Sequence, residues 1–185
     1  MINSLLDIAK IEAGKAELDP TWFEAHRAAT ESARLVETRA NEKEIALIYS
    51  FDPMTQTMWG DEKSFKQILI NLLSNAVKFT TSGSINVALE MKGHEAVLSV
   101  ADTGCGIPQA QQERVFEAFE QVDNRYTKEN SGTGLGLTLV RALARLNGGD
   151  CKIQSVVGQG TTISVSFPQP KQRAVASTAI QARVA

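Results

Sequence analysis

Two asparagines and a lysine recur along one side of a strongly apolar segment, QILINLLSNAVKFT, at residues 67–80. If the segment is a helix, Asn71, Asn75 and Lys78 stand at positions i, i+4 and i+7, opposite the apolar stripe. Carboxamide oxygens are hard ligands that suit Mg²⁺, and a lysine ammonium supplies a point charge for phosphate oxygens. Taken alone, the Asn-x-x-x-Asn spacing favours a solvated helix face.

A second candidate is ADTGCGIP, at residues 101–108. Asp102 ends an apolar strand, and the two glycines that follow let the backbone pass close to a ligand. An ionised carboxylate only accepts hydrogen bonds, so it can receive one from an exocyclic amine such as N6 of adenine. Guanine would present a carbonyl oxygen at that position and be repelled. The alternative is a purely structural role, in which Asp102 forms an Asx turn at the end of a strand.

A third candidate is the glycine-rich GTGLGLTLV, at residues 132–140. Its glycines lead into the start of a helix, where unpaired N–H groups and the helix dipole favour phosphate. The segment is not a P-loop, because no Lys-Ser/Thr follows, and it lies too late in the chain for a dinucleotide-binding fingerprint. Alone it is weak evidence for a phosphate site.

The elements that must position these segments follow from the hydrophobic pattern. Strands with clean alternation bury only one face, which indicates a mixed, mostly antiparallel sheet with helices on one side. The fold class predicted is therefore α/β, a two-layer α/β sandwich. The pattern predicts helices over residues 2–13, 22–40, 61–80, 109–119 and 135–147, and strands over 44–51, 57–59, 85–91, 95–102, 151–157 and 163–167.

Three segments are not expected to belong to the compact core of the domain. A helix over residues 2–13 is too short to be stable alone. We therefore expect its apolar face to pack on a partner outside this chain or on a second copy. An ordinary N-terminal helix fits the spacing equally well. Residues 120–131 are polar and predict a long loop, and the tail after Pro168 has no apolar period and predicts disorder.

The composition narrows the function classes. A chain of 185 residues suits one domain with short flanking pieces. A net charge of −2 gives no electrostatic case for nucleic acid or for contact with an anionic membrane. Cys105 and Cys151 have neither disulfide-framework nor zinc-ligand spacing. We therefore expect a cytoplasmic location for this segment, whether or not the parent protein is anchored in a membrane.

The order of the motifs is more specific than any one of them. Together with FEAFEQVD at 116–123 and GQGTT at 158–162, the three segments resemble the N, G1, F, G2 and G3 boxes of sensor histidine kinases, in that family's order. The opening LLDIAKIEAGK resembles the end of the family's dimerisation helix. The resemblance spans residues 2–168, nearly the whole chain.

This resemblance implies the Bergerat ATP-binding fold of the GHKL superfamily, with ATP and Mg²⁺ as cofactors. It implies three regions: 1–14 as the end of the dimerisation helix, 15–168 as the ATP-binding catalytic domain, and 169–185 as a tail. It makes Asn75 the Mg²⁺ ligand and residues 120–131 a lid over the nucleotide, hinged at Phe116 and Phe119, with Arg125 and Lys128 as lid cations. The implied ATP-binding residues are Asn71, Asn75, Lys78, Phe79, Asp102, Gly104, Gly106, Ile107, Gly132, Thr133, Gly134, Leu135, Gly136, Leu137 and Thr161.

The resemblance also identifies the partners. The family's phosphoacceptor lies in a His-Glu-Leu/Phe-Arg-Thr-Pro-like motif, and neither His26 nor His94 has those surroundings. We therefore expect phosphoryl transfer to a histidine on the kinase's dimerisation and phosphotransfer domain, and onward to a response regulator. The alternatives are a module that binds ATP without transferring phosphate, and a relative that phosphorylates serine or hydrolyses ATP to drive a clamp. The LLDIAKIEAGK junction disfavours the last of these.

Overall fold

The computed structural model describes residues 2–120 and 133–171 of the chain. The helices are α1 (Ile2–Glu12), α2 (Ala25–Glu42), α3 (Glu62–Phe79) and α4 (Gly136–Leu146), with short 3-10 turns η1 (Pro53–Thr55), η2 (Gln109–Gln111) and η3 (Arg114–Phe116). The strands are β1 (Thr21–Glu24), β2 (Ile45–Phe51), β3 (Thr57–Gly60), β4 (Gly83–Lys92), β5 (Glu95–Asp102), β6 (Cys151–Val156) and β7 (Gly160–Pro168). In these residues, no helix is long and apolar enough to cross a membrane.

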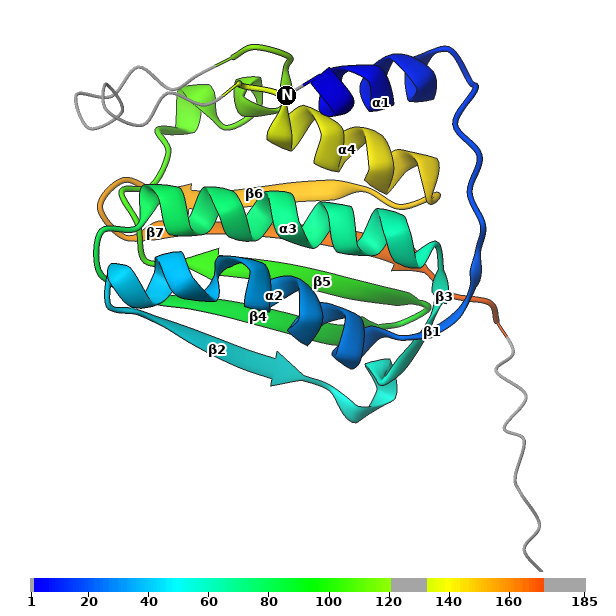
Figure 1. The fold of residues 1–185 in the computed structure, drawn as a ribbon, viewed down its shortest axis with the longest axis horizontal. Helices are drawn as coiled ribbons and strands as arrows, with labels where there is room; N and C mark the ends of the chain where they lie inside the picture. Colours follow the sequence, from blue (N-terminus) through cyan, green and yellow to red (C-terminus); the bar gives the residue numbers. More distant parts are fainter. Residues whose placement is uncertain (1, 121–132, 172–185) are drawn as a thin grey trace, which may run out of the picture.

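Five strands form the main sheet, in the order β2-β4-β5-β7-β6. The β2–β4 pair is parallel and the other three pairs are antiparallel. Figure 1 shows α2, α3 and α4 lying across one face of this sheet. The architecture confirms the predicted two-layer α/β sandwich with a mixed, mostly antiparallel sheet.

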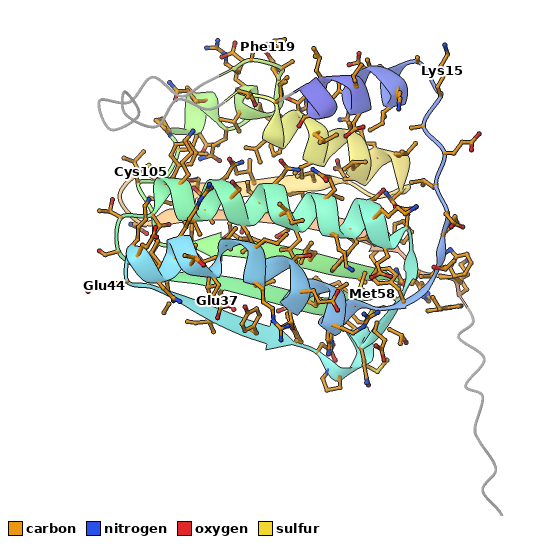
Figure 2. All side chains as sticks on the ribbon, in the orientation of Figure 1. Lys15, Glu37, Glu44, Met58, Cys105 and Phe119 are labelled. Carbon is orange, nitrogen blue, oxygen red and sulfur yellow. The ribbon has the colours of Figure 1, made fainter. Side chains whose placement is uncertain are left out.

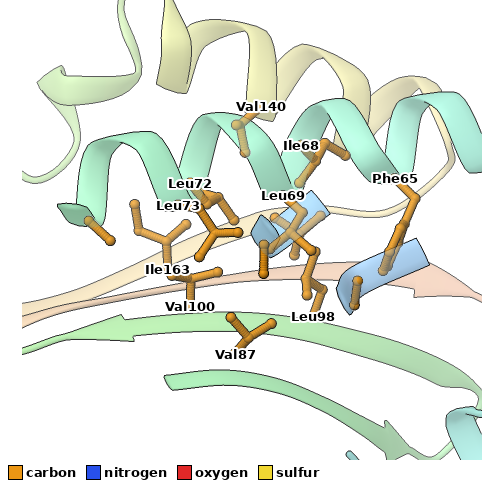
Figure 3. Packing of buried hydrophobic residues seen from close by; sticks show 14 of the residues in the cluster. Phe65, Ile68, Leu69, Leu72, Leu73, Val87, Leu98, Val100, Val140 and Ile163 are labelled. Atoms are coloured by element: carbon orange, nitrogen blue, oxygen red, sulfur yellow. The ribbon is translucent and has the colours of Figure 1, made fainter. Parts of the chain in front are cut away.

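The core lies between α3 and the sheet. Leu69 and Leu73 of α3 are fully buried, and they pack over Val87, Leu98 and other inward-facing strand residues (Figure 3). The Asp61 carboxylate begins α3 by accepting a hydrogen bond from the Ser64 N–H at 2.6 Å. With its apolar side held in the core, α3 must turn its polar side away from the sheet.

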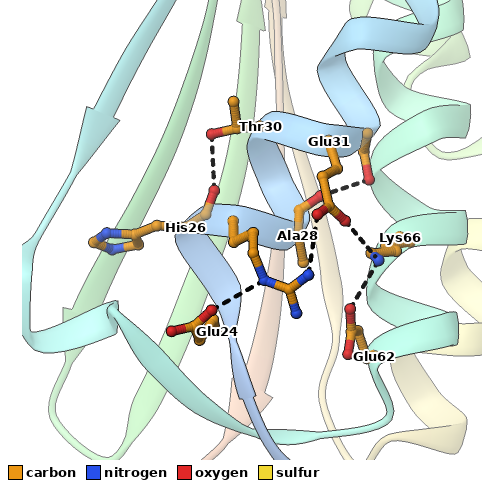
Figure 4. A network of polar contacts seen from close by, with 9 residues as sticks. Glu24, His26, Ala28, Thr30, Glu31, Glu62 and Lys66 are labelled. Atoms are coloured by element: carbon orange, nitrogen blue, oxygen red, sulfur yellow. Dashed lines mark hydrogen bonds and ion pairs between the residues drawn. The ribbon is translucent and has the colours of Figure 1, made fainter.

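A surface ion-pair network joins α2 to α3. Glu31 of α2 contacts both Arg27 and Lys66, and Lys66 also reaches Glu62 of α3 (Figure 4). Exposed pairs of this kind contribute little to stability individually. Here they link α2 to α3 at the surface, outside the core that holds the two helices on the sheet.

Two sequence predictions of local structure are wrong. Trp22 does not begin the second helix, because residues 21–24 form β1, which pairs antiparallel with β3 in a separate two-stranded sheet. Residues 109–119 form two 3-10 turns rather than one helix. The first helix packs on α4 of the same chain (Figure 1), where Ile8 is 6% exposed, while Leu5 and Leu6 of its apolar face remain 49% and 52% exposed.

The two-stranded sheet holds the only tryptophans of the sequence. The rings of Trp22 and Trp59 contact edge to face, with centroids 5.7 Å apart. Gln169, which follows β7, pairs with this sheet: its side-chain oxygen accepts from the Trp59 N–H at 2.8 Å, and its amide nitrogen donates to the Trp59 carbonyl at 3.1 Å. The predicted tail of residues 169–185 thus begins with an ordered residue, and residues 172–185 lie outside the described part.

Candidate functional site

A cavity of about 320 Å³ lies between the C-terminal half of α3, the end of β5 with the turn after it, and the N-terminus of α4. Most of the predicted site residues meet there. Those that line the cavity are Asn71, Asn75, Lys78, Phe79, Asp102, Gly106, Ile107, Thr133, Gly134, Gly136, Leu137 and Thr161. Gly104 and Leu135 are buried and are not part of the wall.

Of the predicted lid, residues 120–131, the structure describes only Glu120. Gly132, Arg125, Lys128 and the remainder of residues 121–131 lie outside the described residues. Glu120, the last residue before that gap, lines the cavity and forms an ion pair with Arg114 at 2.8 Å.

One wall of the cavity is the polar face of α3. The Asn71 side-chain nitrogen donates to the Gln67 carbonyl at 2.8 Å, which leaves its oxygen available. A Cβ at Gly136 would lie 3.5 Å from the Asn71 side-chain oxygen and 3.7 Å from the Asn75 side-chain nitrogen. The first residue of α4 therefore faces both carboxamides, so that helix-terminal N–H groups and amide oxygens converge on one region. That combination suits phosphate oxygens and a hard cation.

Asn75 is suited to the metal role. Within the described residues its carboxamide makes no hydrogen bond, and the side chain is half-buried at the cavity wall. The oxygen and nitrogen of such a group exchange places by a simple rotation, so the oxygen can face the cavity. In the same part of the chain, no cluster of three or more His, Cys, Asp or Glu residues could hold a metal by itself. One amide oxygen beside phosphate matches the way Mg²⁺ is commonly held, with several waters retained.

Lys78 and Phe79 form the end of α3 at the cavity. Burial lowers the pKa of the Lys78 ammonium, which lies 4.7 Å from the centre of the Phe79 ring. The Phe79 carbonyl accepts a hydrogen bond from the Cys105 N–H at 3.3 Å. This bond ties the last turn of α3 to the loop that follows β5.

Asp102, the last residue of β5, lines the cavity close to the end of α3, because a Cβ at Gly104 would lie 2.6 Å from the Phe79 carbonyl oxygen and 2.8 Å from an Asp102 carboxylate oxygen. Burial raises the pKa of its carboxyl group, against hydrogen bonds from the backbone N–H groups of Gly104 and Thr161 that favour the charged form. The Gly104 bond measures 2.8 Å. Gly104 therefore acts on the site through Asp102 rather than as part of the wall.

Two glycines shape the turns around the cavity. Gly106 has φ of 71°, and a Cβ there would collide with the Val156 carbonyl, so the turn after β5 can press against the β6–β7 hairpin. Gly134 has φ of 69°, and its Cβ would lie 2.8 Å from backbone atoms of Phe119. Only glycine fits either position without backbone movement.

Sequence reasoning found only part of the apolar wall, namely Phe79, Ile107 and Leu137. Val100 and Ile163 line the cavity two residues from Asp102 and Thr161, on the same faces of β5 and β7. Their strand alternation was a usable signal, because residues i and i+2 share a face. The other cavity residues not predicted are Leu72, Ser74, Ala76, Cys105 and Val115, whereas Glu120 is the first residue of the predicted lid.

Behind the wall, Ser155 and Gln112 form a hydrogen-bond network that no sequence pattern indicates. The Ser155 hydroxyl accepts from the Ile107 N–H at 2.7 Å and lies 2.9 Å from both the Gly160 carbonyl and the Thr161 hydroxyl. The Gln112 amide donates to the Ile107 carbonyl at 3.0 Å and to the Ser155 carbonyl at 2.8 Å. The network joins the turn after β5 to the β6–β7 hairpin.

Comparison with known proteins identifies relatives of this arrangement. The family model for histidine kinase-, DNA gyrase B-, and HSP90-like ATPases matches residues 60–171. The circadian input-output histidine kinase CikA of Synechococcus elongatus is 41% identical over 172 residues, and the histidine protein kinase DivJ of Caulobacter vibrioides is 39% identical over 180. These matches cover 91% and 96% of this chain but only 23% and 30% of the relatives.

Solved structures agree. The crystal structure of full-length ShkA in complex with AMPPNP matches 91% of this chain and 35% of its own, with a TM-score of 0.81 and 32% identity. The nucleotide-free catalytic domain of the histidine kinase ThkA matches 82% of this chain and 99% of its own, with a TM-score of 0.71 and 25% identity.

Proposed function

The chain belongs to the histidine kinase-, DNA gyrase B-, and HSP90-like ATPases, and we propose that it transfers the γ-phosphate of ATP to a histidine on the dimerisation domain of its own kinase. At the level of the domain, it is an ATP-binding catalytic domain of the sensor histidine kinase type. The observation that carries the proposal is that one cavity is lined both by the Asp102 carboxylate and by a helix N-terminus that faces two asparagines.

Two groups of cavity residues have different tasks in this proposal. Asp102 accepts a hydrogen bond from the 6-amino group of adenine, and Val100 and Ile163 supply apolar surface for the base. In the second group, Lys78 and the N-terminus of α4 hold the phosphates, and Asn75 is the Mg²⁺ ligand. The bound nucleotide supplies the transferable phosphoryl group, and the protein contributes positioning and charge stabilisation.

The acceptor belongs to another domain in this proposal. The His26 ring nitrogen lies 2.9 Å from the Thr55 hydroxyl and 3.2 Å from the Asp52 carbonyl, and the ring packs on Phe51. His94 lies in the turn between β4 and β5, and neither histidine lines the cavity. The proposed partners are therefore the dimerisation and phosphotransfer domain of the kinase and a response regulator. Residues 1–14 would be the end of the dimerisation helix. The proposed setting is cytoplasmic.

Phosphotransfer to a supplied partner tests the proposal. The chain is incubated with γ-labelled ATP, Mg²⁺ and a separately produced dimerisation domain that carries its histidine. We expect acid-labile phosphate on the supplied domain, none on this chain, and none when Asn75→Ala replaces the parent. Label on His26, on His94 or on a serine would contradict the proposal, as would tight ATP binding without transfer to any cognate domain.

A further inference from the structure

Ser155 fills every hydrogen-bonding position of its hydroxyl. A serine hydroxyl has one proton to donate and two lone pairs to accept with. The Ile107 N–H can only donate to the Ser155 oxygen, and the Gly160 carbonyl can only accept from it. The third contact, with the Thr161 hydroxyl at 2.9 Å, contains two oxygens that could each be the donor.

Only one arrangement places a proton in all three contacts. Ser155 gives its single proton to Gly160, because that carbonyl has none of its own. Thr161 must then donate to Ser155, and the two lone pairs of Ser155 accept from Ile107 and from Thr161. In the reverse arrangement the Ser155 and Gly160 oxygens would face each other at 2.9 Å without a proton between them, which is repulsive.

This arrangement decides what Thr161 can do toward a ligand. Thr161 is 8% exposed and lines the cavity directly across the β5–β7 pair from Asp102. Since its proton is held by Ser155, its oxygen can only accept from a ligand. Asp102 and Thr161 thus form an acceptor-only end of the cavity, which matches an amino group and repels a carbonyl oxygen.

We propose that Ser155 is a specificity-determining positioning residue, which makes the nucleotide site select a 6-amino purine over a 6-oxo purine by fixing the direction of the Thr161 hydroxyl. The inference rests on the proposed nucleotide site and concerns its choice of base. Ser155 does not line the cavity and acts only through Thr161.

The test compares ADP with IDP, whose bases differ at position 6. Both affinities are measured by calorimetry on the folded protein with Mg²⁺ present, and their ratio is the readout. A variant that is partly unfolded weakens both ligands equally, so the ratio reports selectivity and not stability. In Ser155→Ala the Thr161 hydroxyl can rotate and donate to the 6-oxo group, so we expect the preference for ADP to fall about five- to tenfold.

Three further variants sharpen the result. Ser155→Thr keeps the hydroxyl and should keep the ratio. Ser164→Ala is the matched control, because it removes another hydroxyl pair of the same sheet, Ser99 of β5 with Ser164 of β7 at 2.8 Å, away from the cavity. Thr161→Val should lower the ADP preference and cancel any further effect of Ser155→Ala.

The outcomes separate this inference from the proposed function. Failure of the unmutated chain to bind ADP would overturn the proposed function. Selective ADP binding with an unchanged ratio in Ser155→Ala would overturn only the role of Ser155. If Ser155→Ala does not fold, Thr161→Val decides alone: a raised ADP preference would show that Thr161 donates to the ligand and would overturn the inference.

Discussion

The ammonium nitrogen of Lys43 lies 2.7 Å from the carbonyl oxygen of Val77. The same ammonium is 3.2 Å from the carbonyls of Lys78 and Thr80, so all three of its donors are directed at the last turn of α3. Lys43 follows α2 directly and therefore caps a helix other than its own. A cation at this end also complements the helix dipole.

Replacing Lys43 should loosen the end of α3 that carries Lys78 and Phe79. In Lys43→Met we expect the free energy of unfolding to fall by about 1–3 kcal/mol, because three carbonyls lose a charged donor. Nucleotide affinity should also fall. Urea denaturation and calorimetry measure the two effects, and Lys152→Met, an exposed lysine on β6, is the control. Equal stability of the two variants would contradict the capping role.

Removing the Asn75 carboxamide should abolish the dependence of nucleotide affinity on Mg²⁺. In Asn75→Ala we expect ADP affinity to become nearly independent of Mg²⁺, because the proposed protein ligand to the metal is gone. Asn71→Ala is the comparison, since Asn71 lies one turn earlier on the same face and should weaken binding while leaving the dependence on Mg²⁺. A folded Asn75→Ala protein with the parental Mg²⁺ dependence would refute the assignment.

The raised pKa of Asp102 predicts the direction in which the free energy of unfolding changes with pH. Burial raises this pKa in the folded protein, so the folded state holds the proton more tightly than the unfolded state. The stability contribution is present below the ordinary aspartate pKa and is lost as pH rises through the raised one. Relative to Asp102→Asn, the parent should therefore lose stability as pH rises from about 4.

Asp61 provides a control of opposite sign. Burial opposes its ionisation, but hydrogen bonds from the Ser64 and Asp19 backbone outweigh burial and lower its pKa. Its stabilising contribution is present above the ordinary aspartate pKa and is lost as pH falls through the lowered one. Urea unfolding of Asp102→Asn and Asp61→Asn across the acid range measures both slopes. Slopes of the same sign would show that one environment is misassigned.

Cys105 should report occupancy of the cavity. It lines the cavity and is partly exposed, whereas Cys151 is 8% exposed and burial raises its pKa to about 12. Burial raises the pKa of Cys105 as well, with the Asp102 charge adding to the shift, so alkylation should be slow at neutral pH and faster in base. Mass spectrometry should find iodoacetamide on Cys105 alone, and less of it with ADP present.

The control for this labelling is Cys105→Ser, which should take up no label while folded. If saturating ADP left the alkylation rate of Cys105 unchanged, the nucleotide would have to bind elsewhere.

The sequence allowed most of the fold to be predicted where the signal is local. The apolar stripe and the Asp61 cap of α3 lie within a few residues of each other, and the predicted helix matches the structure. By contrast, β1 exists because residues 21–24 pair with residues 57–60, and no local pattern encodes that pairing. Its Trp22 happens to continue the apolar spacing of α2, which is why a single helix was predicted.

The site divides in the same way. Asn71, Asn75, Asp102 and the glycines were predictable because each belongs to a short motif with its own chemistry. Ser155 was not, because its significance comes from contacts with the Ile107 N–H and the Thr161 hydroxyl, which only the folded hairpin brings together. The predicted helix over 109–119 is replaced by turns in which Gln112 bonds to the backbone of Ile107 and Ser155.

The two tryptophans are intrinsic fluorescent probes of one defined region of the protein. Trp22 and Trp59 stand at the N-terminal end of α3, next to Gly60, while the cavity lies at its C-terminal end. A helix of 18 residues is about 27 Å long. Tryptophan emission therefore reports on the N-terminal end of α3, and nucleotide titration reports on its C-terminal end. Coincidence of the two signals during denaturation would show that α3 and the layers around it unfold as a single cooperative unit.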